Sequence, residues 1–323
     1  MTETQTQRAV IVDPTAGVSH LKLAEVALPT PGKSETLVRV TAISLNRGEV
    51  RMSLSAEATE KTGWRPGWDF AGMVETESAD GKGLKAGTRV VGISRPGAWA
   101  QFVAVPNESI AALPDNVTDS QAATLPVAGL TAYYALAKGG FLLGKPVLIT
   151  GATGGVGDYA LQLAKLAGAK VVAHIRKPEQ EEEVRSAGAG AVVIGEDLTV
   201  SSPFSAYHLI LDAVGGDTLS QSLRLLDEGG TVVTYGTTAE KTVTFDAQKF
   251  YGTGATTLYG FILFDEFRST DTAADGLTRL AQLVSEGKLT PRISLEADWS
   301  ETPDIAAQLI DRKYPGKAVL HVK

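Results

Sequence analysis

A short apolar run that leads directly into a glycine-rich loop is the feature that most constrains this chain. Residues 145–150 (KPVLIT) resemble a buried strand, residues 151–157 (GATGGVG) follow at once, and residues 158–167 carry apolar side chains at helical spacing. Small residues let the backbone approach a pyrophosphate, and free N–H groups at the helix start bind the anion. The order strand, loop, helix predicts a dinucleotide site, and the alternative is a tight turn without a ligand. The loop residues predicted to bind the cofactor are Ala152, Thr153, Gly154, Gly155, Val156 and Gly157.

The residue that follows the next strand indicates which dinucleotide binds. An NAD site places Asp or Glu about 20 residues beyond the loop, where the carboxylate accepts hydrogen bonds from the ribose. Here Arg176 stands at that spacing, with His174 and Lys177 beside it, and the first carboxylate is Glu179. A guanidinium pairs bidentately with a 2′-phosphate, which a carboxylate would repel. The sequence therefore predicts NADPH rather than NADH, the alternative being that Arg176 and Lys177 are solvated loop charges.

The rest of the chain divides by its pattern into two kinds of segment. Residues 10–104 hold short β-branched runs separated by turn residues, as in a β-rich domain. After about residue 120, strand-like runs alternate with helical patterns, which predicts βαβ units around a parallel sheet. Residues 316–323 (GKAVLHVK) indicate one more strand. A length of 323 residues also suits two domains.

Composition excludes several classes of protein and site. The chain has no cysteine and four well-separated histidines, which rules out thiolate zinc sites and disfavours any metal site. The net charge of −7 and the absence of a Lys/Arg run argue against a nucleic-acid partner. No apolar run approaches the roughly 20 residues of a membrane-spanning helix, and the polar start lacks a secretion signal. We therefore expect a cytoplasmic protein with no membrane partner and no metal.

Several motifs in order along the chain resemble the medium-chain dehydrogenase/reductase superfamily. The resemblance is strongest to its zinc-independent quinone oxidoreductase branch, which includes zeta-crystallin-like enzymes, and it covers nearly the whole chain. The matching segments are residues 44–49 (SLNRGE), 66–72 (PGWDFAG), 98–106 (AWAQFVAVP), 125–132 (LPVAGLTA), 152–157 (ATGGVG), 212–216 (DAVGG) and 229–230 (GG). Zinc-dependent members carry Gly-His-Glu where this chain has Gly67-Trp68-Asp69, so the zinc ligand is missing as well as every cysteine.

This resemblance implies an α/β architecture with two domains. Residues 122–263 would form a Rossmann domain with a doubly wound parallel sheet. Residues 1–121 and 264–323 would form a GroES-like, β-rich catalytic domain, completed by the C-terminal segment. Relatives commonly form homodimers through the Rossmann domain.

The resemblance also implies roles for residues outside the glycine-rich loop. Asn46 matches the position that contacts the nicotinamide ribose and borders the substrate, with a turn-forming asparagine as the alternative. Thr131 matches a cofactor contact, or else caps a helix. Tyr235 and Gly236 follow a strand at its carboxyl end, and Phe261 matches a segment behind the nicotinamide. The acids Glu49 and Asp69 are expected to fix loops rather than to catalyse.

Without a metal, the chemistry suits hydride transfer from NADPH to a quinone or to the β-carbon of an enone or enal. Hydrogen-bond donors would stabilise the developing negative charge, and holding the reactants together would supply much of the rate. Two alternatives remain open from the sequence. One is an enoyl-thioester reductase on the same fold, and the other is an NADPH-binding sensor or structural protein without turnover.

Overall fold

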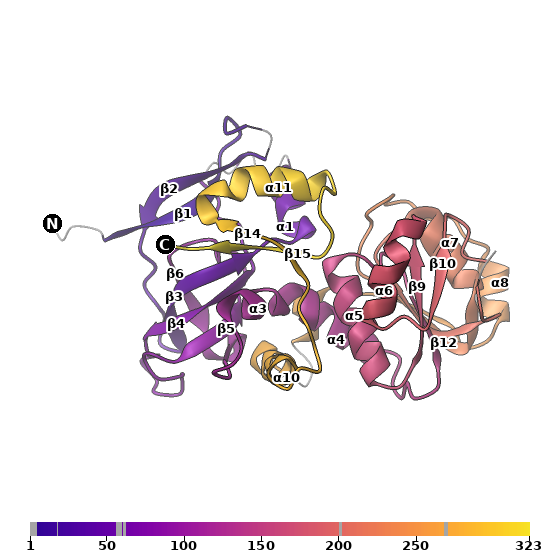
Figure 1. Cartoon of the computed structure of the whole chain (residues 1–323). Helices are drawn as coiled ribbons and strands as arrows, with labels where there is room; N and C mark the ends of the chain where they lie inside the picture. The colour runs from indigo at the N-terminus through magenta and orange to yellow at the C-terminus, as the bar shows by residue number, and fades with distance from the viewer. Residues whose placement is uncertain (1–4, 18, 56–59, 61–62, 200–201, 268–270) are drawn as a thin grey trace. The chain divides into compact units, whose positions relative to one another are not determined.

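The computed structural model describes residues 5–323 except 18, 56–59, 61–62, 200–201 and 268–270 (Figure 1). The chain divides into two compact units. The first unit combines Met1–Leu130 with Phe267–Lys323, and the second unit is Thr131–Glu266. The C-terminal part of the chain therefore returns to the unit in which the chain begins.

Antiparallel sheet dominates the first unit. Its strands are β1 (Thr6–Val12), β2 (Leu21–Ala27), β3 (Glu35–Ser44), β4 (Asp69–Thr76), β5 (Arg89–Ile93), β6 (Phe102–Pro106), β7 (Ile110–Ala112), β14 (Ile293–Asp298) and β15 (Lys317–His321). Among the described residues, β1 and β2 form a hairpin and the other seven form one sheet, in the order β14-β15-β3-β4-β5-β7 with β6 paired to β3. The strand predicted near residue 320 is β15, which pairs antiparallel with β3 through Val319 opposite Ser44.

The core of the first unit lies against this sheet. Phe70, Trp99 and Ile43 are completely or almost completely buried, and Trp299 and Leu320 join them from the C-terminal part of the chain. Burying such side chains is worth roughly 1.5–3 kcal/mol each, so the returning segment is part of the same core and not an appendage. The helices of this unit are α1 (Arg47–Ser53), α3 (Asp119–Ala123), α10 (Ala273–Ser285) and α11 (Thr302–Ile310).

The second unit is a parallel α/β sheet. Its strands are β8 (Pro146–Ile149), β9 (Lys170–Ile175), β10 (Ala191–Ile194), β11 (Tyr207–Asp212), β12 (Leu226–Thr234) and β13 (Thr257–Gly260). Within the described residues they lie in the order β10-β9-β8-β11-β12-β13, and every pair is parallel. This is the strand order of the Rossmann sheet. The spatial order changes direction between the first and fourth strands along the chain, whereas the strands themselves stay parallel. The predicted α/β fold is confirmed.

Six helices of this unit precede, connect or follow these strands among the described residues. They are α4 (Leu130–Ala137), α5 (Gly155–Leu166), α6 (Glu181–Ala187), α7 (Gly216–Arg224), α8 (Ala247–Gly252) and α9 (Leu263–Glu266). The apolar side of α7 packs on β11 and β12, where Leu219 and Leu223 join a buried cluster with Ile210 and Val232. Helix α6 lies beside α5 (Figure 1).

Candidate functional site

The glycine-rich loop connects β8 to α5 at the point where the strand order reverses. Gly151 has φ = +61°, and the N–H of Gly154 donates to the Gly151 carbonyl at 3.0 Å, which closes a tight turn. A Cβ atom on Gly157 would lie 2.5 Å from the Gly151 oxygen and 2.7 Å from the Ala152 backbone. Only glycine fits at position 157, because the helix packs directly against the loop.

The start of α5 is suited to hold an anion. Its N-cap is Gly154, which has no side chain to accept a hydrogen bond from the first turn. The backbone N–H groups of residues 155–157 therefore lie at the positive end of a helix of 12 residues. Asp158, also in the first turn, is buried and accepts from Gln162 Nε2 at 2.9 Å. These features fit the pyrophosphate of a dinucleotide.

A buried carboxylate, Asp212, holds together the strand ends that flank this loop. It lies at the end of β11 and accepts from Thr150 Oγ1 at 2.8 Å, Gly215 N at 3.0 Å and Val214 N at 3.3 Å. Burial raises the pKa of the Asp212 carboxyl group, and these donors oppose that shift. Asp212 thus fixes the carboxyl ends of two neighbouring strands, the edge at which doubly wound sheets bind ligands.

Tyr235, Gly236 and Phe261 lie at the same edge of the sheet. The N–H of Tyr235 donates to the Asp212 carbonyl at 3.0 Å, and that of Phe261 donates to Thr234 O at 2.9 Å. A Cβ atom on Gly236 would lie 2.9 Å from the Ala213 oxygen. Within the described part of the chain, the Tyr235 hydroxyl is buried without a hydrogen-bond partner, and burial raises its pKa. An unpaired buried hydroxyl is costly, so Tyr235 is the most unusual of these three residues.

The three residues predicted at the adenosine end have different surroundings. His174, in β9, is buried, and its Nε2 donates to the Gly195 carbonyl at 2.7 Å. Burial lowers the pKa of His174. Arg176 and Lys177 follow β9 and are exposed, and Lys177 Nζ lies 3.8 Å from Glu179 Oε1. Arg176 is therefore the residue best placed to meet an anion from solvent, whereas His174 already uses one ring nitrogen to hold the backbone after β10.

Thr131 occupies the first turn of α4 and is 6% exposed. It is the first residue of the second unit. It precedes all the other predicted cofactor residues of that unit along the chain. Asn46 is the one predicted site residue that belongs to the first unit.

Asn46 is the N-cap of α1 and lies in a buried ionic cluster. Its Nδ2 group donates to Glu49 Oε1 at 3.1 Å and to Asp69 Oδ2 at 2.7 Å, and its Oδ1 accepts from Lys317 Nζ at 2.6 Å. An ammonium group has only donors and an ionised carboxylate only acceptors, so this amide orientation is required chemically. Both amide hydrogens are therefore occupied, and one lone pair of Oδ1 remains available.

The two acids of the cluster fix backbone, as predicted. Glu49 accepts from the N–H groups of Asn46 at 2.7 Å and Trp68 at 2.8 Å. Asp69 accepts from Ser44 Oγ at 2.7 Å and from Val127 N at 2.9 Å. Burial and the nearby charge of Asp69 raise the pKa of Glu49 well above its ordinary value.

Lys317 is the member of this cluster that sequence reasoning missed. Its side chain is 4% exposed, and Nζ donates to Asp69 Oδ2 at 3.2 Å and Leu45 O at 3.0 Å. It lies at the start of β15, far from Asn46 in sequence. The sequence feature that could have indicated Lys317 is its position as the first residue of an apolar strand, KAVLH. A charged side chain buried with such a strand needs a buried partner.

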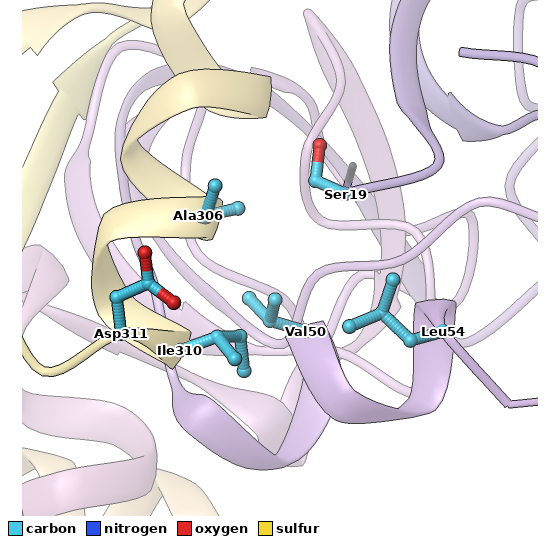
Figure 2. A pocket seen from close by; sticks show the side chains of 7 residues that line it. Ser19, Val50, Leu54, Ala306, Ile310 and Asp311 are labelled. Carbon is cyan, nitrogen blue, oxygen red and sulfur yellow. The ribbon is translucent and has the colours of Figure 1, made fainter. Parts of the chain in front are cut away.

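A small cavity in the first unit lies beside α1 and α11 (Figure 2). Its volume is about 50 Å³, enough for a very small number of water molecules. Its lining is Ser19, Val50, Leu54, Ala306, Ala307, Ile310 and Asp311. None of the predicted site residues lines this cavity.

No group of three or more His, Asp or Glu side chains in the described part of the chain is arranged to hold a metal ion. Likewise, none of the helices within the described ranges has the length and apolar character needed to cross a bilayer.

Comparison with known proteins identifies the family. Residues 32–115 match the family model described as alcohol dehydrogenase GroES-like domain, and residues 155–279 match the one described as zinc-binding dehydrogenase. The chain is 31% identical to the chloroplast envelope quinone oxidoreductase homolog of Arabidopsis thaliana, covering 94% of both chains. It is 29% identical to the NADPH-dependent alkenal/one oxidoreductase of the same plant, covering 94% of this chain and 77% of that one.

A solved structure agrees with these sequence relatives. The quinone oxidoreductase of Coxiella burnetii superposes with a TM-score of 0.85 at 27% identity, covering 99% of this chain and 100% of that one. The chain therefore belongs to the medium-chain dehydrogenase/reductase superfamily. Within the superfamily it falls in the zinc-independent quinone oxidoreductase branch, as the sequence motifs predicted.

Proposed function

We propose that this protein is an NADPH-dependent, zinc-independent oxidoreductase that reduces a quinone or the carbon–carbon double bond of an α,β-unsaturated carbonyl compound. The observation that carries the proposal is the glycine-rich loop at the switch point of a Rossmann sheet, with Arg176 exposed after the next strand. The names of the relatives, quinone oxidoreductase and alkenal/one oxidoreductase, support the substrate class.

NADPH, when bound, supplies a hydride from its nicotinamide ring. The N–H groups at the start of α5 would hold its pyrophosphate, together with the predicted loop from Ala152 to Gly157. Arg176 would pair with the 2′-phosphate, and Lys177 would add positive charge nearby. Thr131, His174, Tyr235, Gly236 and Phe261 complete the proposed cofactor site.

Asn46 would contribute through its carbonyl oxygen. Its amide hydrogens are held by Glu49 and Asp69, so the remaining lone pair of Oδ1 is what it offers to a ligand. A ribose hydroxyl that donates a hydrogen bond matches this lone pair, whereas a ligand carbonyl does not. In this proposal residues 122–263 form the domain that binds the cofactor. Residues 1–121 with 264–323 form the catalytic domain, which carries Asn46.

Cofactor choice provides the first test. Arg176→Ala should raise the Kd for NADPH about 10- to 100-fold, because a charge-assisted hydrogen-bonded pair is lost, and should leave the Kd for NADH unchanged. Lys177→Ala is the matched control, with a smaller effect because Lys177 already faces Glu179. Equal weakening of NADH and NADPH by Arg176→Ala would contradict a 2′-phosphate role.

The acceptor is tested by following NADPH oxidation under anaerobic conditions with a quinone, a cyclic enone, an enal and an enoyl-CoA. Turnover of the first three classes supports the proposal. Preference for the enoyl-CoA would instead favour an enoyl-thioester reductase. NADPH binding without any turnover would favour a sensor or structural role.

We further propose a homodimer and a cytoplasmic location. The outermost strand, β13, supports the dimer, because it leaves one edge of the parallel sheet unpaired within the described residues. Leu258 on this strand is 39% exposed, and Ile262 just beyond it is 59% exposed. An exposed apolar edge strand is a ready site for pairing with the same strand of a second copy.

A further inference from the structure

Two adjoining segments of the second unit form a surface that the proposed reaction does not use. Residues 138–145 precede β8, and residues 165–170 connect α5 to β9. The N–H of Gly144 donates to Gly168 O at 2.8 Å, and that of Lys170 donates to Lys145 O at 2.8 Å. The segments are thus held side by side. Their apolar–basic surface consists of Phe141, Leu143, Leu166, Lys145, Lys165 and Lys170.

Large apolar side chains project from this surface. Phe141 is 76% exposed, Leu143 is 62% exposed and Leu166 is 48% exposed. Leu142, between the first two, is 5% exposed and anchors the segment in the unit. Single exposed apolar residues need no explanation, but three gathered on two contacting segments mark an interaction surface.

The charge of this surface is opposite to that of the whole chain. Neither segment contains an Asp or Glu, and the exposed lysines 145, 165 and 170 form no ion pair among the described residues, whereas Lys138 pairs with Glu266 at 2.7 Å. The chain as a whole carries a net charge of −7. Asp227 and Glu228, at the start of β12, lie two strands beyond β8 along the same edge of the sheet. Along this edge the charge therefore changes sign between β8 and β12.

We propose that the apolar–basic surface docks peripherally on an anionic lipid surface. Phe141 and Leu143 would enter the interface between headgroups and acyl chains, and the lysines would lie against anionic headgroups. A second copy of the chain does not fit this surface, because a symmetric contact would bring its lysines onto the same lysines. A fluid lipid interface accepts projecting apolar side chains without a preformed complementary pocket.

This inference goes beyond the proposed enzymatic function and does not depend on it. It assigns a lipid contact to a chain whose sequence predicts no membrane partner. Loss of lipid binding would leave NADPH oxidation intact, and loss of NADPH binding would leave the lipid contact intact. The two proposals therefore fail separately.

Vesicle flotation with the full-length protein tests the inference. We expect the protein to float with vesicles of phosphatidylcholine and phosphatidylglycerol and to remain unbound with phosphatidylcholine alone. Raising the salt from ~0.1 M to ~1 M should weaken binding strongly, because the Debye length falls from about 10 Å to about 3 Å.

Two pairs of variants separate the apolar and basic contributions. Phe141→Ser with Leu143→Ser should weaken vesicle binding at least about tenfold, because both inserted side chains are lost. Its control is Tyr251→Ser, since Tyr251 is 69% exposed elsewhere on the same unit. Lys145→Gln with Lys170→Gln should weaken binding roughly 25-fold, about fivefold for each lysine near the surface.

The charge control is Lys241→Gln with Lys249→Gln, which removes the same charge from exposed positions away from this surface. Both control variants should bind vesicles as the unmodified protein does. Absence of flotation with anionic vesicles, or equal loss in the controls, would overturn the inference. Displacement from vesicles by an RNA oligonucleotide at lower concentration than by free anionic vesicles would also overturn it, in favour of a nucleic-acid surface.

Discussion

Three acceptor atoms in the first unit, Leu45 O, Asn46 Oδ1 and Asp69 Oδ2, meet at the ammonium group of Lys317. Replacing Lys317 by Met leaves the fully buried Asp69 carboxylate without its counterion. We expect a loss of about 3–5 kcal/mol in the free energy of unfolding, measured by urea denaturation. Adding Asp69→Asn should recover part of that loss, because the unpaired charge is then removed.

The control is Lys313→Met, because Lys313 is exposed and lies 3.5 Å from Asp311 at the surface. It should change stability by less than about 0.5 kcal/mol. If Lys317→Met had as small an effect, the cluster would not be the buried ionic centre described here.

A second residue-scale prediction concerns pH. Burial lowers the pKa of His174 below its ordinary value of 6.5. The folded state therefore resists protonation, so its stability is full above pH 6.5 and falls as the pH drops below that value. The slope attributable to one such group is at most about 1.4 kcal/mol per pH unit.

His174→Gln keeps a donor for the Gly195 carbonyl and removes the titrating group. Its free energy of unfolding should therefore decline less between about pH 7 and pH 5 than that of the unmodified chain. The measurement is urea unfolding across that range, with an NMR titration of the His174 ring as an independent check. An unshifted ring pKa would contradict the role assigned to burial.

At the residue scale, motif position and residue type were enough to predict the loop glycines, Arg176 and Asn46 as site residues. The sequence did not indicate that Lys317 touches Asn46, because their meeting depends on how β15 pairs with β3. Nor did it distinguish the buried His174 from the exposed Arg176, since burial depends on neighbouring strands and not on the local pattern.

At the scale of elements, the turn between β8 and α5 carries the sharpest steric constraint. Gly157→Ala places a methyl group 2.5 Å from the Gly151 oxygen, so either the helix or the loop must shift. We expect a loss of about 1–3 kcal/mol in stability, measured by thermal or urea unfolding. NADPH affinity should fall as well, because the N–H groups at the helix start are displaced.

Gly154→Ala is the matched control within the same loop. Its Cβ would lie 3.2 Å from the same oxygen, and Gly154 has φ = −78°, which alanine adopts readily. It should destabilise the protein less than Gly157→Ala. Equal destabilisation by the two changes would mean that the close contact at position 157 does not decide the packing.

Most elements of the second unit followed from their patterns, because buried parallel strands produce short apolar runs that glycine and polar residues bound. Helix α6 is preceded directly by a 3₁₀ turn, Pro178–Gln180. Proline suits the first position of such a turn, because its missing N–H group would have no partner there in any case.

At the scale of the whole molecule, the proposed dimer depends on β13. Leu258→Lys with Ile262→Lys puts charges on the exposed edge and should convert a dimer to monomers in sedimentation equilibrium. Met52→Lys is the control, since Met52 is 44% exposed in the first unit. An unmodified protein that is monomeric at micromolar concentration would contradict the dimer.

The arrangement of the chain into two units also has a consequence for its synthesis. Residues 131–266 are continuous in sequence, so the Rossmann sheet can form while later residues are still being translated. The antiparallel sheet begins first along the chain but lacks β15 until residue 321 has left the ribosome. Until then Asp69 and Glu49 have no ammonium partner, and the edge of β3 that pairs with β15 stays open. The part translated first is thus the part completed last, and a chaperone that shields β-strand edges would act on it during that interval.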